Sequence, residues 1–303
     1  MPMQQSKITV VVPVYNRELL LIRCLDLIAA QDIRPLSIII VDNNSSDKSL
    51  ETARSWATVH GRELNVTVLS EPRPGAARAR QTGLEHVRTE WVQFFDSDDV
   101  MAPGILPDAL NACADYDMVC WKRELIGLDA RHSVSPYRSD DVLRCHMYNG
   151  MLSTVSYMVR SEFIRLCGGW DPAARVWDDW EVGFRLLLRN PSIRCLDRVG
   201  AIVYSQNESI TGTSFSAKAG QWEGIIDMVQ SYEPGRRDVI EMLDYRRVNL
   251  AALYTREGHP ELGRKLLVDT LRKTGCNASR RLLLRMIYHY TRLGGRGAYL
   301  LWR

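Results

Sequence analysis

The chain has 303 residues, of which 46% are hydrophobic and 25% charged, a composition that allows an ordinary globular core and excludes wholesale disorder. The formal net charge of +3 is too small to indicate a nucleic-acid partner, whereas an acidic small molecule needs only a few well-placed cations. The polar start lacks the apolar segment of a signal peptide, and no stretch reaches the roughly 18 uncharged apolar residues of a membrane span. We therefore expect a cytoplasmic protein. Its seven scattered cysteines form no Cys-x-x-Cys pair, which predicts buried, reduced thiols.

The first hundred residues alternate between short apolar runs and segments with helical spacing. Strands are expected at 8–12, 36–41, 66–69 and 91–95, and helices at 18–31, 49–59 and 78–87. This order is typical of an α/β fold with a mostly parallel sheet, in which ligands bind beyond the carboxyl ends of the strands. Polar clusters at 13–16, 42–47 and 96–99 each follow a strand directly, so we expect them to meet in one crevice.

The alternation weakens after residue 101. Apolar stretches remain near 118–121, 155–159 and 201–204, with a helix expected at 180–188, which suggests a second half built onto the same sheet. From about residue 217 the pattern is helical. We therefore predict one domain over residues 1–214 and a helical C-terminal region over 215–303.

Three carboxylates follow the strand predicted at 91–95, namely Asp96, Asp98 and Asp99, with Ser97 between the first two. At about 6 Å and an effective dielectric constant near 20, each pair repels by roughly 3 kcal/mol, so a cation should lie between them. Hard oxygen ligands suit Mg²⁺ or Mn²⁺, which would also neutralise a diphosphate. The alternative is a solvated turn in which Asp98 or Asp99 caps a helix that starts near Pro103.

Two further segments could carry chemistry. Arg78 or Arg80 could face phosphates, although two arginines so spaced on a helix point to different faces and one could simply be solvated. Asp179 could take a proton from an acceptor hydroxyl, or the acids at 178–181 could cap the helix that they open. The turn at 168–171 could shape a sugar site, or stop a helix over a buried tryptophan.

Six segments in order resemble motifs of the family 2 glycosyltransferases of the GT-A type. They are residues 12–16, 41–47, 75–83, 96–99, 168–171 and 178–180. The resemblance implies a GT-A α/β fold, with a mostly parallel nucleotide-binding sheet flanked by helices and a helical C-terminal extension. It also implies metal-assisted transfer of a sugar, with inversion, from a nucleotide-diphosphate sugar to a glycan, a lipid-linked molecule or another acceptor. UDP is the favoured nucleotide because the family uses it most.

The resemblance also assigns roles to residues. Nucleotide-sugar contacts are expected from Pro13, Tyr15, Asn16, Asp42, Arg80, Asp96 and Ser97, a contact to Mn²⁺ or Mg²⁺ from Asp98, and the catalytic base is Asp179. Contacts to the acceptor or donor sugar are expected from Gly169, Trp170, Asp171, Asp178 and Trp180. The sequence departs from the family at Gln81, where asparagine is common, and around 204–207, where an arginine and often a histidine are expected. Gln206 or Asn207 could replace that metal contact with a neutral oxygen.

Two alternatives compete with this interpretation. The chain could be a sugar-nucleotide binding protein or an inactive partner subunit, since the usual arginine or histidine is missing. It could also be a haloacid-dehalogenase-like phosphatase, because residues 96–100 fit the pattern Asp-x-Asp-x-Thr/Val. P-loop and dinucleotide-binding glycine motifs are absent from the sequence.

The C-terminal region has two interpretations of its own. Arg280, Arg281, Arg285 and Arg292 lie among leucines and tyrosines and could contact an anionic membrane, in keeping with a peripheral location at its inner face. Alternatively, this region forms a helical cap with a solvated basic face.

Overall fold

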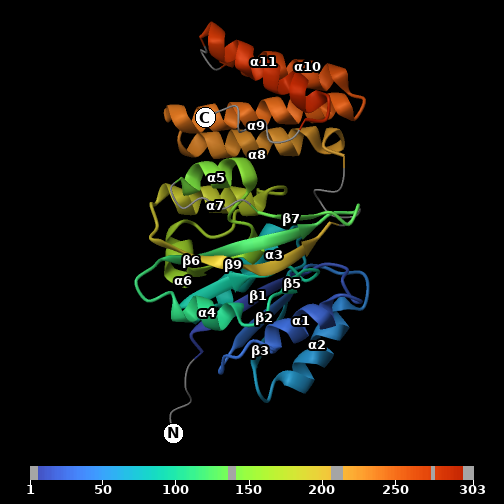
Figure 1. Ribbon diagram of the computed structural model, residues 1–303. Helices are drawn as coiled ribbons and strands as arrows, with labels where there is room; N and C mark the ends of the chain where they lie inside the picture. The colour runs from blue at the N-terminus through green and yellow to red at the C-terminus, as the bar shows by residue number, and fades with distance from the viewer. Residues whose placement is uncertain (1–5, 136–140, 206–213, 274–276, 296–303) are drawn as a thin grey trace. The chain divides into compact units, whose positions relative to one another are not determined.

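The chain divides into two compact units, Met1–Ser205 and Gln206–Arg303. The computed structural model describes residues 6–135, 141–205, 214–273 and 277–295. The first unit combines strands and helices, whereas the described part of the second is helical (Figure 1).

The first unit begins with the alternation that the sequence predicts. Its elements up to the fourth strand are β1 (Ile8–Val14), α1 (Leu21–Ala29), β2 (Ser37–Asp42), α2 (Ser49–His60), β3 (Asn65–Ser70), α3 (Ala76–His86) and β4 (Trp91–Phe94). They are followed by β5 (Val100–Met101), α4 (Ile105–Asn111), β6 (Met118–Ile126), β7 (His132–Val134), α5 (Val142–Asn149), η1 (Thr154–Ser156), β8 (Tyr157–Arg160), α6 (Ser161–Leu166), α7 (Asp178–Leu188) and β9 (Ile193–Tyr204). The element types agree with the expectation over the first hundred residues, and the bounds differ by at most three residues.

One sheet runs through this unit. Within the described residues its strands lie in the order β3-β2-β1-β4-β8-β6-β9-β5, with β7 paired to β6 (Figure 1). The four strands from β3 to β4 are parallel, but β8 runs antiparallel to both of its neighbours. The sheet is therefore parallel in its first half and mixed in its second. The change of direction begins where the sequence alternation weakens.

Helices cover both faces of the sheet, because successive side chains of a strand point to opposite sides. Val10 and Val12 of β1 face a core shared with α1, α2 and α4. Val11 faces the other core, to which α3, α6 and α7 contribute. Burial on both faces explains why β1 and β2 are almost continuous runs of valine and isoleucine.

The helix after the acidic cluster corrects one expectation. α4 starts after Gly104, which has a φ of +73°, and no side chain caps it. β5 lies between this helix and Asp99. The interpretation of Asp98 or Asp99 as a capping residue is therefore wrong.

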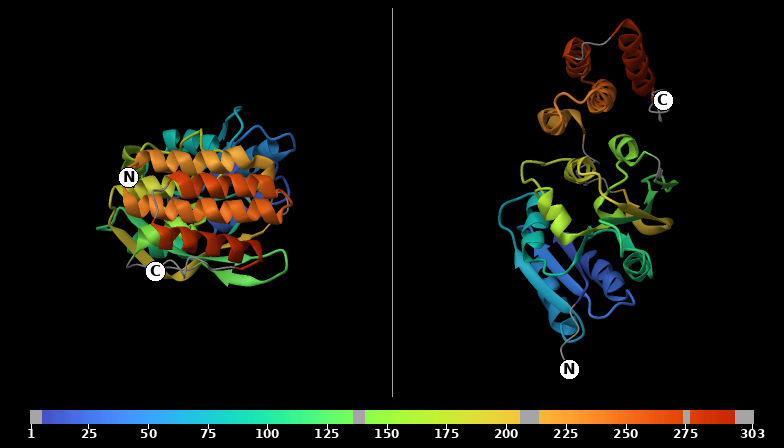
Figure 2. Two further views of the ribbon diagram at one scale, coloured as in Figure 1. Left: turned by 90° about the horizontal axis from the view of Figure 1, so that it is seen from above. Right: turned by 90° about the vertical axis from the view of Figure 1, so that its left-hand side faces the viewer.

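The second unit is built around one central helix. Its described elements are η2 (Ser216–Lys218), α8 (Ala219–Tyr232), α9 (Arg237–Arg256), α10 (Pro260–Lys273) and α11 (Ala278–Arg292). α8, α10 and α11 all pack against α9, and the helices lie side by side in Figure 2. None of the helices in the described ranges has both the length and the apolar character needed to cross a membrane.

Candidate active site

The loops after β1, β2 and β4 lie together at the carboxyl ends of the parallel strands. The N–H of Asn16 donates to Ser45 Oγ at 3.0 Å, and Asn16 Oδ1 accepts the N–H of Ser46 at 2.8 Å. Arg17 Nε donates to Asp98 Oδ2 at 3.1 Å, which ties the first loop to the third. Asn16 has a φ of +50°, which asparagine tolerates better than most residues. The three polar segments thus meet, as the order of the strands predicts.

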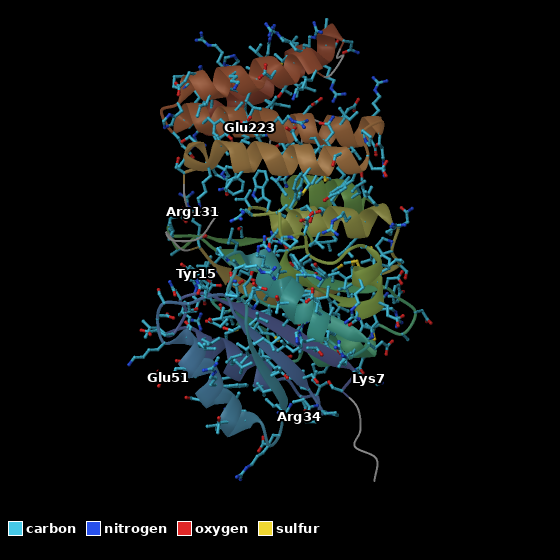
Figure 3. All side chains as sticks on the ribbon, turned by 180° about the vertical axis from the view of Figure 1, so that it is seen from behind. Lys7, Tyr15, Arg34, Glu51, Arg131 and Glu223 are labelled. Carbon is cyan, nitrogen blue, oxygen red and sulfur yellow. The ribbon has the colours of Figure 1, made fainter. Side chains whose placement is uncertain are left out.

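Asp42 ends β2 as a buried carboxylate that is only 2% exposed. Its Oδ2 accepts the N–H of Ser45 at 3.3 Å, whereas Oδ1 has no hydrogen-bond partner among the described residues. An unpaired buried oxygen is costly, so this atom suits an N–H group of a ligand. Pro13 is partly buried, and Tyr15, which is 57% exposed, lies just beyond the opposite end of β1 from Lys7 (Figure 3).

Asn43 organises the loop after β3, a role that was not predicted. Its Nδ2 donates to the carbonyl oxygens of Glu71 and Arg73 at 2.9 and 2.8 Å, and its Oδ1 accepts the N–H of Gly75 at 2.7 Å. Glu71 also accepts hydrogen bonds from Arg73 and Thr82, which lower its pKa to about 2. These bonds fix the backbone just ahead of α3.

Arg80 of α3 joins two parts of the site. Its Nη1 donates to Asp178 Oδ2 and its Nη2 to Asp96 Oδ1, both at 2.5 Å, and its side chain is 7% exposed. The guanidinium lies over the Trp170 ring, 4.9 Å from the centroid. Burial opposes the charge, but Asp178 and Asp96 raise the pKa of Arg80 above its usual value. The arginine therefore stays cationic and links the loop after β4 to the start of α7.

The turn before α7 packs against Arg80 and its neighbour in α3. Gly169 has a φ of +64°, and a Cβ there would lie 2.4 Å from Gln81 Oε1. The same oxygen accepts the N–H of Trp170 at 3.0 Å. Trp170 is 1% exposed and packs edge-on against Phe94. Gln81, a departure from the family pattern, thus helps to hold this turn.

Both carboxylate oxygens of Asp96 have partners. Oδ1 accepts from Arg80, and Oδ2 accepts from Thr154 Oγ1 at 2.8 Å. Thr154 is 2% exposed and lies in η1, where no role was predicted. Ser97, the next residue after Asp96, is 5% exposed. The short helix that leads into β8 therefore helps to fix the acidic loop.

Asp98 and Asp99 are carboxylates whose charge is disfavoured by burial and by the nearby Asp96. Burial and Asp96 raise the pKa of both carboxyls, although Arg17 lowers that of Asp98. Asp99 is 5% exposed, whereas the Asp98 side chain is 21% exposed. Among the described residues, no three Asp, Glu, His or Cys side chains form a group that could hold a metal ion. Asp98, the more accessible of these two carboxylates, could hold a divalent ion together with oxygens of a ligand.

Asp179 lies in the first turn of α7 and is partly buried. Its Oδ1 accepts the N–H of Trp180 at 2.8 Å. Burial and the neighbouring Asp178 raise the pKa of Asp179 to about 6, so at neutral pH it is an ionised and fairly basic carboxylate. Trp177 occupies the capping position and makes no capping hydrogen bond, whereas Asp178, Asp179 and Glu181 lie in the first turn, where the helix dipole favours acids.

Two residues whose charge or burial bears on Asp179 had no predicted role, the partly buried Arg123 and the buried Tyr157. The guanidinium of Arg123, in β6, donates to the carbonyl oxygen of Gly150 at 2.8 Å, and its charge lowers the pKa of Asp179. Tyr157, in β8, is 1% exposed, and its hydroxyl has no hydrogen-bond partner among the described residues. Burial raises the pKa of Tyr157, and Asp179 raises it further. Both residues come from the mixed half of the sheet, which carries no sequence motif.

The start of α7 is anchored from two sides. His146 Nδ1 accepts the N–H of Leu152 at 3.1 Å, so its Nε2–H can donate to the carbonyl oxygen of Trp180 at 2.9 Å. Arg185 Nη2 donates to the carbonyl oxygen of Gly169 at 2.7 Å. Trp180 itself is 2% exposed and belongs to the core.

Other predicted residues lie apart from this network or beyond the described residues. Asp171 Oδ1 accepts the N–H of Ala173 at 2.8 Å, which closes a local turn. Gln206 and Asn207, the candidate third metal contacts, lie outside the described residues.

The sequence has relatives of known class. Residues 9–164 match the family model described as Glycosyl transferase family 2. The succinoglycan biosynthesis protein ExoW of Rhizobium meliloti is 33% identical over 128 residues, which cover 41% of this chain and 40% of that protein. Among the most similar curated relatives, the matched part covers between 11 and 43% of the relative's own length.

Solved structures share the fold at low sequence identity. S. aureus TarS 1-349 in complex with UDP-GlcNAc is 18% identical, with a TM-score of 0.70 over 96% of this chain and 93% of that chain. The mannosyltransferase PcManGT from Pyrobaculum calidifontis, in complex with GDP-Man and Mn²⁺, is 19% identical, with a TM-score of 0.57 over 99% of this chain and 86% of that one. These likenesses confirm the predicted α/β fold of GT-A type with a helical C-terminal region.

Proposed function

The chain belongs to glycosyl transferase family 2, and on this premise we propose that it transfers a sugar from a nucleotide-diphosphate sugar to a hydroxyl group of an acceptor. The observation that carries the proposal is the bridge made by Arg80, whose guanidinium binds Asp96 and Asp178 at the same time. The bridge sets the candidate base, Asp179, in a fixed position relative to the acidic loop at the strand ends.

The donor nucleotide binds at the carboxyl ends of β1, β2 and β4. The unpaired Oδ1 of Asp42 accepts a base N–H, which uracil offers between two carbonyl groups. Tyr15 follows the residue of β1 that pairs with Asp42, and its exposed ring gives the base an aromatic contact. UDP is the proposed nucleotide, and the complex of TarS, a protein of the same fold, with UDP-GlcNAc supports it.

The diphosphate lies near Asp98, where a divalent ion, Mn²⁺ or Mg²⁺, would be held jointly by this carboxylate and the phosphate oxygens. Such an ion would neutralise the negative charge that develops on the leaving diphosphate. The Mn²⁺ in the PcManGT complex supports the choice of metal. Arg17, which donates to Asp98, is a second cation at the same place.

The reaction is a single displacement with inversion. Asp179 removes the proton from the acceptor hydroxyl as its oxygen attacks the anomeric carbon, and the bond from that carbon to the diphosphate oxygen breaks. Burial raises the pKa of Asp179 to about 6, which makes it a stronger base than a solvated aspartate while leaving it ionised at pH 7.

The acceptor is a hydroxyl of a glycan or of a lipid-linked molecule, and the enzyme acts in the cytoplasm. The relationship to ExoW, a succinoglycan biosynthesis protein, supports a polysaccharide pathway. The family match replaces the phosphatase hypothesis.

Thermal unfolding with UDP, GDP, CDP and dTDP, each with and without Mn²⁺, tests donor binding. A ligand at about 100 times its dissociation constant adds roughly 2.7 kcal/mol to stability. We expect a shift with UDP that requires Mn²⁺ and that disappears in Asp98→Ala and in Asp42→Ala. Asp108→Ala changes an exposed acid paired with Arg198 and should leave the shift intact. A folded sample that responds to no nucleotide would refute donor binding.

Catalysis is tested separately, because the second candidate function is a sugar-nucleotide binding protein without activity. That candidate draws support from residues 204–207 of the sequence, which contain neither an arginine nor a histidine. Asp179→Asn should keep the nucleotide shift while losing the release of UDP from UDP-sugars. If the native chain binds UDP-sugars but neither hydrolyses nor transfers them, the binding protein is the correct assignment.

A further inference from the structure

α11 presents an apolar stripe on its outer face. Leu282, Met286, Tyr290 and Leu293 recur at helical spacing and are 60, 54, 45 and 81% exposed. The opposite face of α11 is buried and packs against α9, as the hydrogen bonds of Thr291 to Asn249 and of Tyr288 to Thr255 show. The helix therefore carries apolar residues on two faces, one packed against α9 and one exposed.

A row of cations lies beside this stripe. Arg281, Arg285 and Arg292 are all exposed, and none has an acidic partner among the described residues. Residues 277–295 contain no Asp or Glu at all. Arg280, by contrast, points inward and pairs with Glu241 and Asp244 of α9, so it is a structural residue rather than part of the surface.

We propose that the outer face of α11 docks on an anionic lipid bilayer, with the apolar stripe inserted at the level of the headgroups and the three exposed arginines on the phosphates. The apolar side chains match the acyl region of a bilayer, and the exposed arginines match the negatively charged headgroups above it. A second copy of α11 would offer the arginines no acidic partner, which argues against self-association. A nucleic acid would leave the apolar stripe without a partner.

This surface is independent of the proposed sugar transfer, and it is tested without donor or acceptor. Binding of the full chain is measured by flotation with vesicles of phosphatidylcholine alone and of phosphatidylcholine mixed with phosphatidylglycerol. We expect binding to the mixed vesicles only, weakened by salt. Each arginine contributes about fivefold to partitioning, so the double variant Arg281→Gln/Arg285→Gln should bind about thirtyfold more weakly.

A second variant tests the stripe, and a third serves as a control. Leu282→Glu/Leu293→Glu should abolish flotation while circular dichroism stays unchanged, because both side chains are exposed. Arg264→Gln/Lys265→Gln removes two exposed cations from α10, where no large apolar side chain is exposed, and should bind as the native chain does. An equal loss in the α10 variant would mean unspecific charge attraction and would overturn the proposal.

Two further outcomes would also overturn it: equal binding to neutral vesicles by all variants, or an oligomer that dissociates in Leu282→Glu/Leu293→Glu without any vesicle binding. Nucleotide-induced stabilisation is unaffected by either result, so failure of the docking surface and failure of the proposed function remain distinguishable.

Discussion

Arg123 lies outside every sequence motif, yet its charge lowers the pKa of Asp179, which lies within one. Its charge favours the ionised form of Asp179, so removing it should raise the pKa of that carboxyl above about 6. In Arg123→Gln, the acid limb of the kcat/KM profile should therefore move to higher pH, with activity at pH 6 reduced more than activity at pH 8. Lys122→Gln changes the adjacent lysine, which pairs with the exposed Asp197, and should leave the limb in place. An unmoved limb in Arg123→Gln would show that Asp179 is not the titrating base.

Thr154 makes a second testable contribution. Thr154→Val keeps the shape of the side chain but leaves Asp96 Oδ2 without its hydrogen bond, at a cost of about 1 kcal/mol or somewhat more. Donor binding should weaken roughly fivefold as the acidic loop loosens, measured as the nucleotide-induced shift in melting temperature. Thr154→Ser retains the hydroxyl and should restore most of the shift. Equal binding by the valine variant would mean that Arg80 alone fixes Asp96.

Among single residues, those that lie in sequence motifs could be predicted, whereas those that reach the site through distant strand pairing could not. The convergence of Asp42, Asp96 and Asp98 follows from acids placed directly after apolar strands. Thr154 and Tyr157 could not be predicted, because they reach the site only through the antiparallel placement of β8, and no local pattern marks that pairing.

Among the elements, α3 packs closely against the sheet. A Cβ on Gly83 would lie 2.3 Å from Val11 Cγ1, so the helix rests directly on β1. Gly83→Ala should destabilise the chain by about 1 to 3 kcal/mol through overpacking. A Cβ on Gly224, in α8, would meet no atom within 4 Å, and Gly224→Ala should instead stabilise by up to about 1 kcal/mol. Chemical denaturation of the two variants checks both signs, and a stable Gly83→Ala would contradict this packing.

The pairing of α11 with α9 should depend on pH. Burial raises the pKa of Asp244 to about 7, while Arg280 and Arg247 lower it. Because this folded-state pKa lies above the unfolded value near 3.9, the native state loses stability as pH rises toward 7. Arg280→Gln should raise the pKa of Asp244 further. The difference in unfolding free energy between the native chain and this variant should therefore grow as pH rises through 7. A deficit that is constant from pH 6 to pH 8, measured by thermal unfolding, would contradict this.

The element types of the first hundred residues could be predicted from periodicity because β1, β2 and β3 are each followed by a helix that covers the sheet. The second half of the sheet was harder to predict. β8 and β9 have neighbours that come from distant parts of the sequence, and a short apolar run such as 155–159 does not reveal the direction in which its strand runs.

For the whole molecule, the two compact units each have a core of their own, which predicts two unfolding transitions in calorimetry. UDP with Mn²⁺ should raise one of them, since the described residues of the candidate site all lie within residues 1–205. Arg280→Gln should lower the other. A single transition that responds to both changes would show that the units unfold together.

The bridge between Asp96 and Asp178 also limits how this scaffold can be recombined. A chimaera that takes β1 to β4 from one relative and the segment from β8 to α7 from another would separate the arginine from one of its two acids. Such exchanges should succeed only when Arg80, Asp96 and Asp178 are inherited as a set. A replacement of either segment should therefore keep the arginine and both acids, because the loop after β4 and the start of α7 are held together through the same guanidinium.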